Sequence, residues 1–172
     1  MADPTTELHE PASTGSERDM LLSFLDYFRA VFIRKVEGIS DEQARVTVPP
    51  SPMDLLGMTR HLADVERWWF RGSFAAEVTE GIYESEDDPD LDWHHGPDDT
   101  LDEAVSHWHT EVARAREIVA ATPDLDTAGA TVHPRRGPVT LRWILIHMVE
   151  EYARHCGHAD YLREAIDGRT GD

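Results

Sequence analysis

The feature that most constrains the fold is the C-terminal segment 141–166, in which apolar residues recur at the spacing of an α-helix. Thr140 can cap its start, and Gly168 stands just beyond its end, where helices often terminate. Three earlier segments carry the same periodicity: 17–37, 53–74 and 101–122. We find no convincing strand pattern. The sequence therefore predicts an all-α protein, a four-helix bundle whose helices are joined by long connections.

Capping residues mark the starts of the three earlier helices. Ser16 precedes the first helix, and Ser51 stands before the second, which we expect to begin near Pro52 or Met53. Thr100 precedes the third, and Glu103 gives it the spacing of a capping box. The connection over 77–99 is acidic and is predicted to be a surface loop.

Length and composition predict one soluble, cytoplasmic domain. Residues 1–15 are polar and lack the apolar middle of a secretory signal, so we expect a disordered tail followed by one domain over 16–172. No apolar run approaches the ~20 residues of a membrane span. Cys156 is the only cysteine and cannot form an intramolecular disulfide, which fits a reducing compartment.

The charge of the chain argues against nucleic acid as a partner. The formal net charge is -18, from 34 acidic and 16 basic residues, so a phosphate backbone would be repelled. The most acidic stretch runs from Glu84 to Asp92. We interpret it as a solvated face, with contact to a protein partner as the alternative.

Two polar residues lie one turn apart on the apolar face of the last predicted helix. Glu151 and His155 share this face with Ile144 and Met148, whereas Glu150 points elsewhere. A buried carboxylate and a buried imidazole both need compensation, and a divalent cation supplies it to both. The alternative is a hydrogen-bonded glutamate beside an ordinary core histidine. For an isolated pair with this spacing, that alternative is the more common one.

A third candidate ligand, His61, stands beside the apolar stripe of the second predicted helix. Packing that helix against the last one would bring His61 to Glu151 and His155. Two imidazoles and one carboxylate suit zinc, although nickel, manganese and iron stay open. His147 and His158 flank the pair and are candidate catalytic groups, as hydrogen-bond partners of the ligands or of the substrate. The alternative is that one of them is a fourth ligand.

The remaining aromatic, histidine and cysteine residues are interpreted as structural or solvated. We expect five histidines on loops or exposed helix faces: His94, His95, His107, His109 and His133. Four tryptophans are expected in the core and at helix interfaces: Trp68, Trp69, Trp108 and Trp143. Cys156 is predicted to be a packed thiol rather than a nucleophile. The sequence has no glycine-rich phosphate loop and no Cys-x-x-Cys motif.

Two stretches together resemble a known family. They are His61-Leu-Ala-Asp-Val-Glu-Arg-Trp-Trp-Phe and the segment from Leu141 to Asp160, which contains His-Met-Val-Glu-Glu-Tyr-Ala-Arg-His-Cys-Gly-His. They are similar to the DinB-like superfamily, and more closely to its actinobacterial branch of mycothiol-dependent enzymes. The resemblance covers residues 16–168. It implies a four-helix bundle with a long crossover connection.

The resemblance also implies a metal site and an activity. The family's ligands fall on His61, Glu151 and His155, with Glu in the position that it has in mycothiol-dependent maleylpyruvate isomerase. Where many members have Gln, this chain has His158, so that role is not transferred. The implied activity is a metal-dependent S-transferase that activates a small thiol, mycothiol, for attack on an electrophile. A metal-dependent hydrolase and a non-enzymatic, metal-stabilised binding or stress-response module are the alternatives, and a homodimer is open.

Overall fold

The computed structural model describes residues 8–78, 80–83, 88, 90–133 and 137–171, and most of them are helical. The long helices are α1 (Glu17–Val36), α3 (Leu55–Glu66), α4 (Leu101–Ala121) and α5 (Leu141–Asp167). A short helix, α2 (Asp41–Ala44), precedes α3, and a π-helix, η1 (Arg67–Phe74), continues it. The predicted helical class is confirmed. In the described residues, no helix is both long and apolar enough to cross a membrane.

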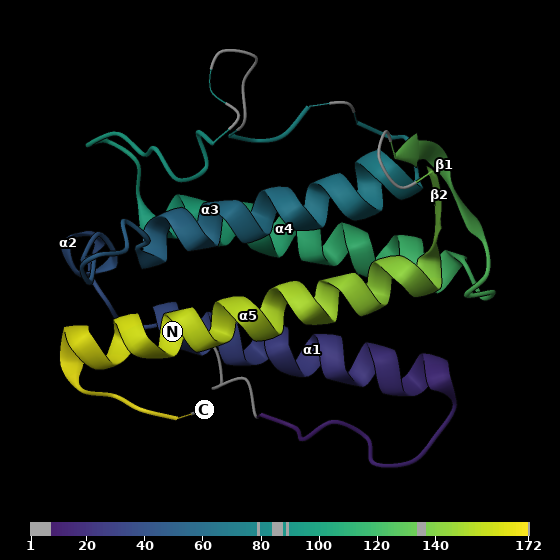
Figure 1. Ribbon diagram of the computed structural model, residues 1–172, viewed down its shortest axis with the longest axis horizontal. Coiled ribbons are helices and arrows are strands. Elements are labelled where there is room, and N and C mark those ends of the chain that lie inside the picture. Colours follow the sequence, from purple (N-terminus) through teal and green to yellow (C-terminus); the bar gives the residue numbers. More distant parts are fainter. Residues whose placement is uncertain (1–7, 79, 84–87, 89, 134–136, 172) are drawn as a thin grey trace.

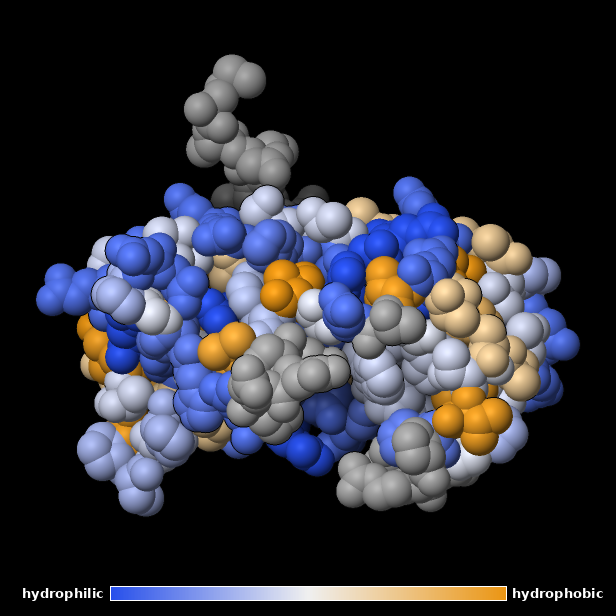
Figure 2. All heavy atoms as spheres, turned by 90° about the horizontal axis from the view of Figure 1, so that it is seen from above, coloured by the Kyte–Doolittle hydropathy of each residue, from blue (hydrophilic) through white to orange (hydrophobic). Residues whose placement is uncertain are grey.

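The long helices pack as two pairs. Helix α1 lies mainly along α5, and α3 lies mainly along α4, as Figure 1 shows. The apolar core fills the space between the pairs, and Phe32, Leu62, Ala115 and Met148 contribute one fully buried side chain from each long helix. Seen from the side of α3 and α4, the surface is mostly hydrophilic, with apolar residues in separate patches (Figure 2).

A buried polar network also joins the long helices. The Arg29 guanidinium of α1 donates to both carboxylate oxygens of Glu66, the last residue of α3, at 2.7 Å each. Tyr152 of α5 donates its hydroxyl to Glu66 at 2.8 Å and accepts the indole N–H of Trp108 of α4 at 2.7 Å. Burial would lower the pKa of Arg29, but the adjacent Glu66 carboxylate outweighs it and raises that pKa. The Arg29 guanidinium therefore stays protonated inside the core.

Local capping explains where most helices begin. Ser16, Thr100 and Thr140 each accept a backbone N–H three residues ahead, as predicted. Gly168 ends α5 in the left-handed conformation, at φ 76°.

The predicted start of the second helix was wrong. Ser51 instead accepts the backbone N–H of Met53, and Asp54 caps α3 by accepting the N–H of Gly57 at 2.7 Å. The carboxylate of Asp54 is a strong cap, so α3 begins only at Leu55.

The predicted helix does continue to Phe74, but its last eight residues form the π-helix η1. The backbone N–H of Ala75 reaches the carbonyl of Phe70 across this wider turn. Gly72 lets the indole of Trp68 lie against the helix, because a Cβ atom there would stand 3.3 Å from Trp68 Cε3. This turn carries the Trp68–Trp69 pair beside His61.

The expectation that the chain has no strands was also wrong. Strands β1 (Ala128–His133) and β2 (Gly137–Thr140) pair antiparallel, with Ala128 opposite Thr140. The hairpin lies on η1, where the Thr131 hydroxyl donates to the carbonyl of Ser73 at 2.9 Å. Most of β1 is exposed, so it lacks the alternation of buried and exposed residues that identifies a strand in sequence.

The chain ahead of α1 touches the core. Residues 1–7 lie outside the described part, and residues 8–15 contain no helix or strand. Leu8 packs against the core, and the backbone N–H of Ala12 donates to the Ser23 hydroxyl at 3.2 Å. A disordered tail over 1–15 stays a prediction.

Candidate metal centre

The structure brings the three predicted ligands together between the helix pairs. His61 comes from α3, and Glu151 and His155 come from successive turns of α5. One donor atom of each residue lies within 4.8 Å of the other two, and the His61 and His155 ring centroids are 4.9 Å apart. Zinc ligands stand about 2.0–2.2 Å from the ion, so small side-chain rotations would bring all three donors onto one cation.

The charge state of Glu151 suits a cation. Its pKa is lowered from the ordinary value, chiefly by the hydrogen bond from His155 and, against the opposing effect of burial, by the nearby imidazoles. The carboxylate is therefore ionised at neutral pH.

The surroundings of His155 favour the ligand interpretation over an ordinary core histidine. The residue is buried, its Nε2 lies 3.5 Å from Glu151, and its Nδ1 has no hydrogen-bond partner among the described residues. A core histidine that served only the fold would normally have both nitrogens satisfied. The donor set thus fits a divalent cation.

An acidic residue that sequence reasoning missed orients His61. The His61 Nδ1–H donates to Asp92 at 2.7 Å, which leaves Nε2 as the nitrogen that can bind a metal. The second oxygen of Asp92 accepts the backbone N–H of Trp93 at 3.0 Å. Asp92 was assigned to the solvated acidic stretch, but it is only 7% exposed. The neighbouring Trp93 could have indicated this burial, since a tryptophan side chain tends to pack against the protein together with the residues beside it. Glu84, Glu86 and Asp87 lie outside the described residues.

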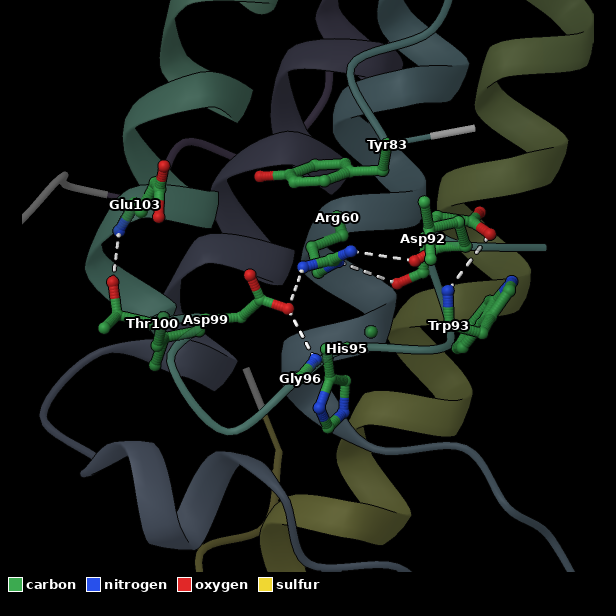
Figure 3. A network of polar contacts seen from close by, with 12 residues as sticks. Arg60, Tyr83, Asp92, Trp93, His95, Gly96, Asp99, Thr100 and Glu103 are labelled. Atoms are coloured by element: carbon green, nitrogen blue, oxygen red, sulfur yellow. Dashed lines mark hydrogen bonds and ion pairs between the residues drawn. The ribbon is translucent and has the colours of Figure 1, made fainter. Parts of the chain in front are cut away.

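Arg60 holds the backbone of the segment that contains Asp92 in place (Figure 3). Its guanidinium donates to the carbonyls of Leu91 and Asp92 at 2.8 and 3.0 Å and pairs with Asp99 at 2.8 Å. The Tyr83 ring covers the guanidinium at 4.0 Å. Because Arg60 directly precedes His61, the crossing segment is held at the turn of α3 that carries the ligand.

A second anchor corrects the expectation for His95, which is half-buried rather than solvated. Its Nε2–H donates to Asp54 at 2.7 Å, and its Nδ1 accepts from Arg45 at 2.8 Å. Asp54 also caps α3, so the same carboxylate starts the helix and holds the segment across it. His94, in contrast, is exposed as predicted.

Replacing Asp92 by Asn should weaken metal binding about 10- to 100-fold, the usual effect of losing an outer partner of a metal-binding histidine. The amide can still accept from His61, but it no longer supplies the negative charge that makes the imidazole a better donor. Competition with a chromophoric chelator measures the affinity. Asp98→Asn, an exposed change in the same segment, is the matched control. Equal affinity in Asp92→Asn and the unaltered protein would contradict the orienting role.

The two predicted catalytic histidines border the ligands. His147 Nε2 lies 3.4 Å from Glu151, and its ring stacks on Trp143 with centroids 4.9 Å apart. The ring of His158 lies 5.6 Å from that of His155, and its Nδ1 is buried without a partner among the described residues. Burial lowers the pKa of His158, and the charges of His155 and Arg154 lower it further.

A cavity of about 290 Å³ opens beside His61. Three indoles and three carboxylates line most of it: Trp68, Trp69, Trp93, Asp64, Asp90 and Asp92. Trp69 and Trp108 are buried as predicted, but Trp68 is 42% exposed and borders the cavity rather than the core. A larger cavity, of about 400 Å³, lies between α1 and α4 and shares no lining residue with the metal centre.

Two further histidines and the cysteine have structural contacts, whereas His109 is exposed as predicted. His107 Nδ1 lies 2.7 Å from the Tyr83 hydroxyl, and the His133 ring stacks on Trp69 at 5.9 Å, so both make contacts that the surface prediction lacked. Cys156 is buried, and its thiol donates to the carbonyl of Phe28 at 3.5 Å. The predicted packed thiol is confirmed.

Comparison with known protein families gives a match over most of the chain. A family model described as Mycothiol-S-transferase matches residues 20–168, which include all three candidate ligands and Asp92. No curated protein matches the chain.

Proposed function

The chain belongs to the mycothiol-S-transferase family, and on that premise we propose that it is a divalent-metal-dependent S-transferase. It would activate a low-molecular-weight thiol, mycothiol, for attack on an electrophile. The observation that carries the proposal is the convergence of His61, Glu151 and His155 beside an open cavity. We further propose that the helices form a DinB-like four-helix bundle with long crossover connections, in a cytoplasmic protein.

The residues of the chain would hold and shape the centre. Glu151 supplies a carboxylate, His155 a buried imidazole, and His61 an imidazole whose Nε2 is freed by Asp92. The ring of Trp93 lies 5.0 Å from that of His61 and 6.1 Å from that of His155. Zinc fits this donor set, with nickel, manganese and iron as alternatives. A cation held by these residues would supply the charge that keeps a bound thiol deprotonated.

His147 and His158 are proposed to assist from either side of the ligands. His147 Nε2 can donate to Glu151 and so keep that carboxylate turned toward the centre. His158 is largely neutral at neutral pH, because burial lowers its pKa, and a neutral imidazole can accept the proton that the thiol loses.

The test is conjugation of mycothiol to a bimane electrophile by zinc-loaded protein. We expect conjugate to form faster than in the protein-free mixture, and the acceleration to disappear after chelation and return with zinc. The electrophile is a halogenated bimane. In the reaction a carbon–sulfur bond forms, the halide of the bimane leaves with its electron pair, and the thiol proton passes to the medium. Turnover of an ester without thiol would favour the hydrolase. Metal binding without turnover of either kind would favour a binding module.

A further inference from the structure

We propose that the cavity beside His61 binds a flat, uncharged aromatic electrophile and discriminates against anionic ones. This inference rests on the proposed transferase function and names the substrate class of that site. It follows from two properties of the cavity walls: rigid indole faces and unbalanced negative charge.

The indole walls are held from behind. A Cβ atom on Gly57 would stand 3.1 Å from Trp93 Cε3, so this glycine makes the room in which Trp93 lies against α3. Gly72 serves Trp68 in the same way on η1, with a separation of 3.3 Å. Trp68 nevertheless leaves 42% of its surface exposed at the cavity. A fixed, half-exposed indole offers a planar ring a stacking surface without a conformational cost.

The carboxylates of the walls are largely committed to the protein. Asp64 accepts the backbone N–H groups of Ile82 and Tyr83, and Asp92 accepts from His61 and Trp93. They therefore contribute negative charge to the cavity more than they offer hydrogen bonds to a ligand. Asp90 is exposed at the cavity and adds a third charge.

The charges around the cavity do not cancel. The three aspartates contribute -3, and a divalent cation with Glu151 would contribute +1, which leaves -2. Arg60 is balanced by Asp99, and no Arg or Lys lines the cavity in the described part of the chain. The net charge of the whole chain is -18. An anion entering here meets repulsion that salt can screen, because the cavity is open to solvent.

The experiment compares two electrophiles that react alike but differ in charge. They are 1-chloro-2,4-dinitrobenzene, which is neutral, and 4-chloro-3,5-dinitrobenzoate, which carries a carboxylate. In each, the thiol sulfur bonds to the ring carbon, chloride leaves with its electron pair, and the thiol proton passes to the medium. For each compound, kcat/KM is measured with zinc-loaded protein and mycothiol. It is then divided by the rate constant for the reaction of the same compound with mycothiol in the absence of protein. We expect at least about a tenfold preference for the neutral compound, shrinking as salt is added.

Variants separate the two properties of the walls. Asp90→Asn, which removes one of the three negative charges of the cavity wall, should reduce the preference for the neutral compound over the anionic one. Trp68→Ala should raise KM for both compounds about 3- to 10-fold, and Trp68→Phe should restore most of the loss. Tyr161→Ala, an exposed aromatic change on α5 outside the cavity, is the control. An equal or greater corrected rate with the anionic compound, or an unchanged KM in Trp68→Ala, would overturn the proposal.

A binding measurement keeps this proposal separate from the transferase proposal. Isothermal titration of zinc-loaded protein with unreactive 1,3-dinitrobenzene and 3,5-dinitrobenzoate needs no turnover. Tighter binding of the neutral compound, weakened in Trp68→Ala, supports the cavity assignment even if no thiol is ever conjugated. Conjugation of both electrophiles together with tighter binding of the benzoate would instead leave the transferase intact and refute the substrate class.

Discussion

The His155→Ala variant should lose more than about 100-fold in metal affinity, beyond the 10- to 100-fold that loss of an outer partner costs. His155 is a buried donor, and its removal leaves Glu151 and His61 on separate helices with no shared third ligand. Metal analysis after dialysis should then find almost no bound zinc, and thiol conjugation should fall with it. Circular dichroism checks that the helices remain.

The control for this variant is His94→Ala, which removes an exposed imidazole that lies 2.8 Å from Asp88. It should keep the zinc content and the rate of the unaltered protein. Glu151→Ala provides an independent second ligand variant. Unchanged zinc content in both His155→Ala and Glu151→Ala would remove the basis of the whole site assignment.

The Glu66→Leu variant should lose about 3–5 kcal/mol of stability, the usual effect of leaving a buried charge without its partner. Glu66 is fully buried and accepts hydrogen bonds from both Arg29 and Tyr152. Its loss leaves the buried guanidinium with the longer contact, 3.3 Å, to the half-exposed Asp26. Urea unfolding followed by circular dichroism measures the change. A chelator is added so that metal binding does not contribute to the free energy of unfolding.

Two further variants test whether the loss of stability in Glu66→Leu comes from the unpaired buried charge. Arg29→Met combined with Glu66→Leu should recover much of the loss, because an apolar pair of similar volume needs no compensation. Glu164→Gln, an exposed change on α5, should leave stability within about 0.5 kcal/mol. If Glu66→Leu unfolded at the same urea concentration as the unaltered protein, the network would not hold the helices together.

Features set by short stretches of sequence could be predicted. A cap needs only a side chain and an N–H three residues ahead, so Ser16, Thr100 and Thr140 were identified correctly. The faces of α5 follow from helical periodicity, which placed Glu151 and His155 together; Glu150 is not in the group that they form with His61. His61 required the further assumption that its helix packs against α5, which the structure confirms.

Features set by contacts between distant segments could not be predicted. In the sequence, Asp92 resembles the other acidic residues of its stretch. It is buried because Arg60 binds its backbone carbonyl and holds the peptide against α3. His95 is half-buried only because Asp54 and Arg45 meet it from elsewhere in the chain. Strand β1 lies on η1 and is mostly exposed, so burial leaves no regular alternation in its sequence. Local pattern reading has no access to such partners.

Because the long helices form two pairs, the candidate ligands could also contribute to the stability of the fold. His61 belongs to the α3–α4 pair, whereas Glu151 and His155 belong to the α1–α5 pair. A cation shared by these residues would cross-link the two halves of the molecule. By mass action, zinc at 100 times its dissociation constant would add about 2.7 kcal/mol to the free energy of unfolding. The lifetime of the protein in the presence of proteases would then follow the supply of the metal, since proteases degrade the unfolded chain.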